Sequence, residues 1–284
     1  MTNLPDLPFA VIGATGQQGG ATARALLAAG AGVRALVRDP EVEAAHALAA
    51  EGVTLIRADL ENPASLRAAF DGVAGVFAVT TPYTGLEAET RHGIAIADAA
   101  KAAGAPHLVY SSVGGADRKT GIPHFESKRR VEEHLESLQL PTTIIRPVFF
   151  MDNFARFAGP TEEDGVLVVR LPLPAGIPLQ MVAVADIGVV ATAALLDPSR
   201  VPGGAVEIGG AELTGEEIAG TYAKVAGEPS RYEALPLSVL DGDGDTQAMF
   251  AWLAEPPSYQ ADFSLTRALA PGVRDFATWL ADRS

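Results

Sequence analysis

The sequence predicts an α/β fold, a Rossmann-type doubly wound parallel sheet with a small, interleaved C-terminal α/β lobe. Three observations carry this prediction. Apolar runs of strand length alternate with helical patterns in the first half of the chain, the first run leads into a glycine-rich turn, and the pattern loses regularity beyond about residue 148. Such alternation is typical of parallel strands joined by right-handed crossovers, with helices on both faces of the sheet.

Six apolar runs in the first half predict the strands of this sheet, with a helical pattern between each pair. The strands are expected over residues 8–13, 33–38, 53–58, 73–79, 107–111 and 142–147. The helices are expected over residues 17–30, 41–51, 64–70, 86–103 and 125–138. Helical crossovers of this kind are what parallel pairing requires.

The second half carries fewer elements. A short strand entering a helix is expected over residues 182–196, a further strand over 205–208 and a helix over 214–225. No repeat or linker separates this half from the first. We therefore expect a dinucleotide-binding core and an interleaved lobe that mainly binds substrate. Their expected extents are 1–150 for the core, 180–210 for a segment that returns to it, and 151–284 for the lobe.

The first strand runs directly into the glycine-rich segment GATGQQG at residues 13–19. Here Gly13 permits a sharp turn, Gly16 lets a phosphate approach the backbone, and Gly19 lets helix and strand pack closely. The helix N-terminus offers unpaired N–H groups and a partial positive charge to an anion. The segment predicts a dinucleotide site, with a G-x-x-G-x-x-G spacing in place of G-x-G-x-x-G. The expected contacts are Gly13, Thr15, Gly16, Gln17, Gln18 and Gly19.

Arg38 closes the second strand, about twenty residues after the glycine turn, where the residue that selects between NAD and NADP belongs. An arginine there accommodates the 2′-phosphate of NADP, and a guanidinium can grip phosphate in a bidentate way. The acidic residue that would favour NAD is Asp39, one place later. NADP(H) is therefore the preferred cofactor, NAD(H) stays open, and Arg38 could also be a solvated arginine at a strand end.

Polar residues follow the other strands, at the edge where ligands sit in doubly wound sheets. Asp59 could accept a hydrogen bond from the adenine amino group, or it could cap the following turn. The further residues expected to contact the cofactor are Leu60, Thr80, Thr81, Pro82, Ser111, Lys128, Pro147, Phe149 and Phe150.

His124 and Lys128 are spaced i, i+4, so on a helix they share one face. Lys128 could bind the nicotinamide ribose and lower the pKa of a neighbouring proton donor, and His124 could be that donor near neutral pH. We predict both as catalytic residues. Taken alone, Lys128 is more readily interpreted as an ordinary surface lysine among charged neighbours.

An aromatic run follows the sixth strand, where a pocket over the nicotinamide could be built. Phe149, Phe150 and Asn153 are the predicted substrate contacts. The alternative is that these aromatic residues pack between the sheet and the lobe.

Composition limits the class of protein. The chain has 284 residues, no cysteine and a net charge of −14. This charge disfavours nucleic acid as a partner. The absence of cysteine fits a cytoplasmic protein. We expect no membrane segment, because no apolar run approaches the roughly 18 residues that span a bilayer. The N-terminus lacks the basic region of a signal peptide.

Histidine and carboxylate spacing gives no reason to expect a metal. The other histidines form no ligand-spaced cluster, and the DGDGD loop at 241–245 lacks the downstream glutamate of a calcium loop. We expect a monomer or homodimer acting on a small molecule.

Together these motifs resemble the NmrA-like branch of the atypical short-chain dehydrogenase/reductases. The matching segments occur in family order over nearly the whole chain. They are GATGQQG at 13–19, VRALVRDP at 33–40, ADL at 58–60, GVFAVTTP at 75–82, VYSS at 109–112, HFESK at 124–128, RPVFFMDNF at 146–154 and VAVADIG at 182–188. The resemblance implies an NAD(P)-binding Rossmann core and a small C-terminal substrate lobe.

The chain departs from the wider superfamily at the catalytic pair Tyr-x-x-x-Lys, where His124 takes the tyrosine place and Lys128 is kept. The lost tyrosine argues against alcohol–ketone chemistry, but it leaves direct hydride delivery to a conjugated acceptor, which needs mainly positioning. The resemblance thus implies a reductase of a quinone-like or polycyclic aromatic substrate, such as a tailoring enzyme. The alternative is a non-catalytic NADP sensor that binds a protein partner.

Overall fold

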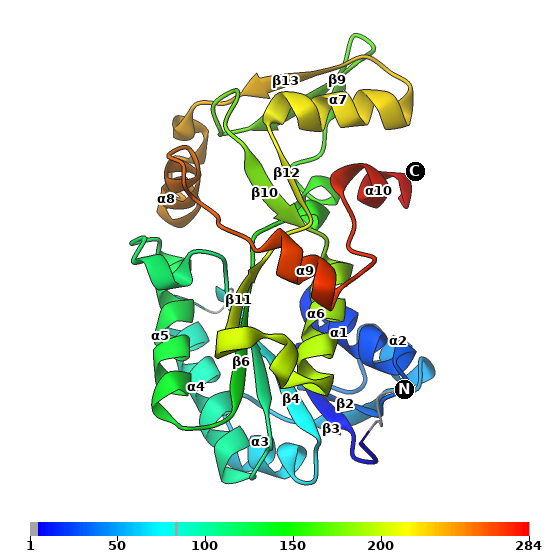
Figure 1. The fold of residues 1–284 in the computed structure, drawn as a ribbon, viewed down its shortest axis with the longest axis vertical. Coiled ribbons are helices and arrows are strands. Elements are labelled where there is room, and N and C mark those ends of the chain that lie inside the picture. Colours follow the sequence, from blue (N-terminus) through cyan, green and yellow to red (C-terminus); the bar gives the residue numbers. More distant parts are fainter. Residues whose placement is uncertain (1–4, 83–84, 284) are drawn as a thin grey trace.

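The centre of the computed structural model, which describes residues 5–82 and 85–283, is a seven-stranded parallel sheet (Figure 1). The strands run in the order β11-β6-β5-β4-β1-β2-β3, so the chain changes direction across the sheet between β1 and β4. Their bounds are β1 Phe9–Ile12, β2 Val33–Val37, β3 Thr54–Arg57, β4 Gly75–Val79, β5 Leu108–Ser111, β6 Thr142–Pro147 and β11 Ala205–Ile208. The predicted doubly wound sheet is confirmed, with a ligand crevice expected where the order reverses.

Helices cover both faces of the sheet (Figure 1). Successive strand residues point to opposite faces, so Phe9 and Val11 join one apolar cluster while Ala10 and Ile12 join the other. One face is covered by α1 (Gln17–Ala28), α2 (Glu43–Ala50) and α6 (Val184–Leu196). The opposite face is covered by α3 (Pro63–Phe70), α4 (Leu86–Ala102) and α5 (Pro123–Ser137).

The lobe lies beyond the carboxyl ends of the central strands and contains two three-stranded sheets (Figure 1). The first comprises β7 (Phe149–Phe150), β10 (Leu179–Val182) and β12 (Ala211–Leu213), and the second β8 (Thr161–Glu163), β9 (Val166–Leu171) and β13 (Ser230–Ala234). Its helices are α7 (Gly215–Ala226), α8 (Gly244–Leu253), α9 (Phe263–Leu269) and α10 (Phe276–Ala281). Most of these short elements are absent from the sequence prediction, which found only α7 and part of β10.

The chain crosses between the two parts more than once. After β10 in the lobe, α6 returns to pack along α1, and β11 pairs in parallel with β6 at the edge of the central sheet. Gly188 makes the helix contact so close that a Cβ atom there would lie 2.4 Å from the carbonyl carbon of Ala21. The lobe is therefore interleaved with the core, as the sequence predicts.

In the part of the chain that the structure describes, no helix combines the length and apolar character needed to cross a bilayer. The first four residues, on which the expectation of no signal peptide partly rests, lie outside the described residues.

Candidate functional site

The turn after β1 holds the strand and α1 in direct contact. Gly13 adopts a φ of +69°, a conformation that L side chains rarely adopt, and its carbonyl accepts a hydrogen bond from the Gly16 N–H at 2.8 Å. A Cβ atom on Gly19 would lie 2.2 Å from the Gly13 carbonyl oxygen. Only glycine therefore fits at position 19 without moving the backbone, and α1 begins against the end of the strand.

The N-terminus of α1 is left open by the protein itself. Its N-cap residue is Gly16, which has no side chain to cap the helix, and no acidic residue lies in the first turn. Thr15, Gly16 and Gln17 are exposed around this end. An uncapped helix start carries unpaired N–H groups and a partial positive charge, which suits a pyrophosphate. Gln18 faces β5 instead, because its Oε1 accepts a hydrogen bond from Ser111 Oγ at 2.6 Å.

A pocket of about 290 Å³ lies at the carboxyl ends of β2 and β3. It is lined by Arg38, Arg57, Ala58, Asp59, Asn62 and Ser65. Both guanidinium-bearing residues are exposed. Arg57 ends β3 opposite Val37, so it stands beside Arg38 across the strand pair. The sequence analysis did not predict Arg57, although Arg57 is the last residue of β3 just as Arg38 is the residue directly after β2.

The acidic residues near this pocket are engaged in local turns. Asp39 Oδ1 accepts the backbone N–H of Glu41 at 3.0 Å, and Asp59 Oδ1 accepts that of Glu61 at 3.0 Å. The structure thus shows Asp59 capping its turn, one of the two roles predicted for it. Leu60, next to it, is half-buried against the apolar cluster of that face. The two arginines make this pocket suited to a phosphate group, although the carboxylate of Asp59 also belongs to its lining.

Lys128 lies at the carboxyl end of β4, in a buried cluster. Its Nζ donates to the Thr80 carbonyl oxygen at 2.6 Å and to Thr80 Oγ1 at 3.1 Å, and it lies 3.0 Å from Glu89 Oε1. Burial lowers the pKa of the Lys128 ammonium, and the charge of Glu89 opposes that shift. Lys128 is therefore not a solvated surface lysine. Its three N–H donors have three acceptors within the chain.

The carboxylate beside Lys128 was not identified from the sequence. Glu89 is fully buried on α4, and its Oε2 accepts a hydrogen bond from Ser127 Oγ at 2.6 Å. The hydroxyl of Tyr110 lies 3.2 Å from Thr80 Oγ1, and burial raises the pKa of Tyr110, so the phenol stays protonated. A buried Glu in the first turn of a helix has no distinct sequence signal, since first-turn acids usually interact with the helix dipole.

His124 lies one turn before Lys128, near the start of α5, and its partner comes from the lobe. Its Nδ1 lies 2.7 Å from Asp245 Oδ1, and its backbone N–H donates to the same oxygen at 3.1 Å. Asp245 belongs to the first turn of α8, within the segment expected to be a loop. The separation of 121 positions along the chain explains why sequence reasoning missed this pair.

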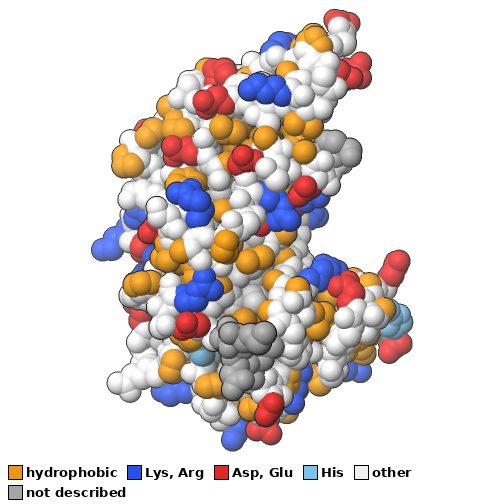
Figure 2. Space-filling view, turned by 45° about the vertical axis from the view of Figure 1, so that its right-hand side comes forward, with side chains coloured by type: hydrophobic (Ala, Val, Ile, Leu, Met, Phe, Trp, Pro, Cys, Tyr) orange, Lys and Arg blue, Asp and Glu red, His pale blue; other side chains and the backbone are white. Residues whose placement is uncertain are grey.

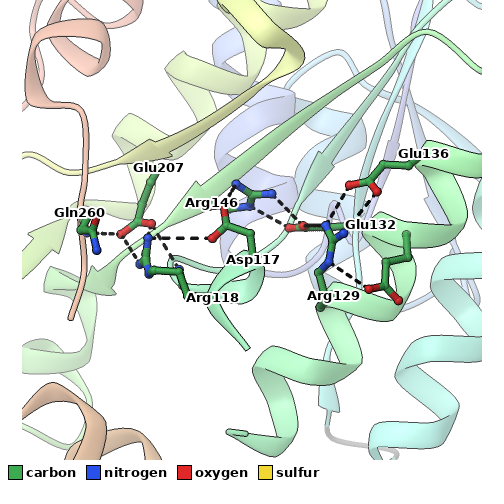
Figure 3. Close-up of polar contacts among 10 residues, drawn as sticks. Asp117, Arg118, Arg129, Glu132, Glu136, Arg146, Glu207 and Gln260 are labelled. Carbon is green, nitrogen blue, oxygen red and sulfur yellow. Dashed lines mark hydrogen bonds and ion pairs between the residues drawn. The ribbon is translucent and has the colours of Figure 1, made fainter. Parts of the chain in front are cut away.

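A chain of charged side chains fixes α5 against the sheet (Figure 3). Arg146 of β6 donates to both carboxylate oxygens of Glu132 on α5, at 3.0 and 2.8 Å, and Glu132 is fully buried. Arg146 also reaches Asp117 at 2.6 Å. At the other end, Glu207 of β11 accepts from Arg118 and from the backbone N–H of Gln260. The helix that carries His124 and Lys128 is thereby fixed to β6 of the central sheet.

The aromatic run after β6 divides between packing and exposure. Phe149 is buried, with its ring 6.0 Å from that of Phe154 and 6.4 Å from that of Phe250. Pro147 is also buried, whereas Phe150 and Asn153 are half-buried and Thr81 and Pro82 are exposed. Phe149 therefore belongs to the packing between sheet and lobe, while Phe150 and Asn153 stay candidates for substrate contact. Figure 2 shows the surface hollowed at the right-hand side, between the lobe above and the core below.

These residues share one edge of the central sheet. The glycine turn, Arg38, Thr80 and Ser111 follow or end β1, β2, β4 and β5, and the start of α5 follows β5. No group of three or more histidine, cysteine or carboxylate side chains that could hold a metal occurs among the described residues. The open start of α1 and the Arg38–Arg57 pocket suit nucleotide phosphates, and the start of α5, which carries His124, follows β5 at the same edge of the sheet.

Comparison with known proteins adds two kinds of likeness. The NmrA-like family model matches residues 8–260. A relative from Xenophilus azovorans, named NAD(P)H azoreductase, is 31% identical over 260 residues, covering 88% of each chain. Among solved structures, a complex of the negative transcriptional regulator NmrA with NAD has a TM-score of 0.85 at 23% identity and covers 98% of this chain and 95% of that one.

A second solved structure, the NADPH complex of the Escherichia coli quinone oxidoreductase QOR2, has a TM-score of 0.81 at 23% identity and covers 97% and 99% of the two chains. At such identities the structural likeness concerns the fold. The NmrA-like family model extends over most of the chain. This protein belongs to the NmrA-like family.

Proposed function

We propose that the protein is an NADP(H)-dependent reductase that passes a hydride to a quinone-like or polycyclic aromatic acceptor. The observation that carries the proposal is the pairing of two sites at one sheet edge. The open start of α1 and the Arg38–Arg57 pocket suit the pyrophosphate and 2′-phosphate of NADP, and His124 stands at the start of α5 on the same edge. The relative named NAD(P)H azoreductase supports the same class of chemistry.

The cofactor would supply the hydride, and the chain's own residues would bind, orient and protonate. The backbone N–H groups at the start of α1 would hold the pyrophosphate, and Arg38 with Arg57 would hold the 2′-phosphate. Reduction of a quinone to its hydroquinone takes one hydride from the cofactor and one further proton in total, which together convert both quinone oxygens to hydroxyls. His124 would give that proton to the acceptor oxygen, acting as a general acid.

Lys128 has a narrower role than the family resemblance implies. With its ammonium bonded to Thr80 and Glu89, it fixes the end of β4 beside the cofactor site. A ribose hydroxyl could be bound by Lys128 only if it shared or replaced one of these contacts. We therefore assign Lys128 to organising the site and His124 to the proton transfer.

The decisive test is stopped-flow oxidation of bound NADPH against a panel of quinones and azo dyes. We expect at least one acceptor to accelerate oxidation. The His124→Ala variant should lower kcat by about a hundredfold while leaving the Kd for NADPH unchanged, as expected for loss of a general acid. The His134→Ala variant, which removes a histidine paired with Asp98 at the far end of α5, is the matched control and should keep wild-type kcat. Failure of every acceptor to accelerate oxidation contradicts the proposal.

One observation favours the second candidate, a non-catalytic sensor of NADP that binds a protein partner. The three donors of Lys128 are satisfied within the chain, so Lys128 offers no unused donor to a ribose or a substrate. Capture of a defined protein partner that depends on NADP, together with no turnover of any acceptor, would favour the sensor.

A further inference from the structure

We infer that Asp245 of the lobe is a positioning residue for His124 of the core, holding the imidazole in the tautomer that leaves Nε2 as its proton-exchanging atom. This inference rests on the proposed function for its catalytic meaning. The arrangement itself is independent of it. One oxygen of Asp245 receives both the ring Nδ1 at 2.7 Å and the backbone N–H of the same histidine at 3.1 Å.

The chemistry of the pair determines where the ring proton lies. An ionised carboxylate only accepts hydrogen bonds, so Nδ1 must be the protonated nitrogen in the neutral imidazole. Nε2 then carries the lone pair, and it has no hydrogen-bond partner among the described residues. In the doubly protonated ring the second proton sits on Nε2, because Nδ1 already carries the first. Proton transfer to an acceptor oxygen returns the ring to the Nδ1–H tautomer.

The position of Asp245 is itself determined by the lobe. Asp243 begins α8 by accepting the Thr246 N–H at 3.1 Å, which fixes the first turn of that helix. Farther along, the ring of Trp252 packs edge-on against Phe125 at 5.5 Å, and Phe125 follows His124 directly. Figure 1 shows α8 lying over the start of α5. The lobe thus determines the orientation of the His124 ring, although His124 itself belongs to the core.

A purely structural role is the competing explanation. A carboxylate at the N-terminus of α5 would stabilise that helix through its dipole and its unpaired N–H groups even if the ring played no part. The two roles differ in what they do to the ring nitrogens. Capping leaves the tautomer free, whereas positioning fixes it.

Nitrogen NMR of the histidine rings separates the two. Protein carrying ¹⁵N-labelled histidine is recorded in alkaline buffer without cofactor, and the His124 signals are assigned by their loss in His124→Gln. We expect the wild type to show a protonated Nδ1 and a bare Nε2. Asp245→Ala should shift the proton toward Nε2. Asp245→Asn should keep the wild-type pattern, because the backbone N–H of His124 holds the amide oxygen in place.

Asp243→Ala is the matched control, since it removes the cap of α8 without removing the oxygen that faces His124. We expect it to leave the ring pattern unchanged. In the stopped-flow assay Asp245→Ala should lower kcat about tenfold to a hundredfold at unchanged Kd for NADPH, a part of what a positioned general acid contributes. Asp245→Asn should recover part of that loss.

The nitrogen spectra and the turnover assay test the role of Asp245 and the proposed function separately. A wild-type ring protonated on Nε2, an Asp245→Ala spectrum identical to the wild type, or an equal change in Asp243→Ala would overturn the inference. If Asp245→Ala does not fold, the wild-type and Asp245→Asn spectra still decide it. Absence of turnover with every acceptor overturns the proposed function alone, because the nitrogen spectra still decide whether Asp245 positions the ring.

Discussion

The helices α1 and α5 begin at the same edge of the sheet, but the backbone N–H groups of their first turns differ in whether the chain supplies a hydrogen-bond partner. At the start of α1 the N-cap is Gly16, which makes no side-chain hydrogen bond, and the first turn contains no acidic residue. At the start of α5 the backbone N–H of His124 already has a carboxylate partner, supplied by the lobe. The first turn is open to an external anion, while the second is satisfied internally and orients a side chain. Uncapped helix starts therefore indicate ligand sites only when nothing in the chain reaches them.

The largest expected effect comes from breaking the buried ion pair between Glu89 of α4 and Lys128 of α5. Glu89→Gln leaves the Lys128 ammonium buried without its counter-charge, which should lower the free energy of unfolding by about 3 kcal/mol at neutral pH. Burial already lowers the pKa of Lys128, and losing Glu89 would lower it further. The unfolded state then binds more protons than the folded state below the ordinary lysine pKa of 10.5. Stability of the variant should therefore rise with pH through that window.

Urea unfolding at neutral and alkaline pH measures this effect. The control is Glu87→Gln on the same helix, which breaks an exposed pair with Arg130 and should cost less than about 1 kcal/mol at either pH. If the loss in free energy of unfolding of Glu89→Gln stays constant or grows with pH, the protonation of Lys128 is not the cause of that loss.

The next largest effect tests whether the pocket that contains Arg57 binds the 2′-phosphate of NADPH. Arg57→Ala should raise the Kd for NADPH by about tenfold or more, the worth of one charge-assisted hydrogen bond, and should leave the Kd for NADH almost unchanged. Fluorescence titration of both cofactors measures the difference. Arg67→Ala removes the same charge from the exposed far end of α3 and serves as the control. Equal weakening of NADPH and NADH would remove Arg57 from the 2′-phosphate site.

The smallest effect comes from making the start of α1 resemble that of α5. Gly16→Asp places a capping carboxylate where Gly16 has extended backbone angles and should change the free energy of unfolding by less than about 1 kcal/mol. The same carboxylate should weaken NADPH binding by about fivefold through repulsion of the phosphates. Gly16→Asn, which caps without charge, is the comparison. Unchanged NADPH binding in Gly16→Asp would mean that the pyrophosphate lies away from this turn.

The sequence was most informative where backbone geometry dictates residue type. The glycine turn, the six core strands and β11 follow from local pattern, because a positive φ at Gly13 or a buried parallel strand restricts which residues fit. The lobe was mostly missed, since β8, β12 and β13 are short and partly exposed, and short exposed strands have little periodicity.

The candidate site shows the same division. Arg38 could be located by counting from the turn, while Arg57, Glu89 and Asp245 matter through neighbours distant in the chain. The DGDGD segment had the composition of a loop, and only the fold reveals that its last two residues belong to α8 and that the last of them contacts a histidine. Side-chain partners across 121 positions leave no trace in local sequence.

The close contact between Gly188 and Ala21 has a consequence for how the polypeptide assembles. A fragment that ended near residue 150 would expose the face of α1 that α6 covers and would leave β6 as an open edge without β11. Open edges pair with other chains and aggregate. During synthesis, α6 and β11 must therefore emerge from the ribosome before the nucleotide-binding half can complete its fold. Because these contacts join residues that are far apart in the sequence, we expect that half to fold slowly and late.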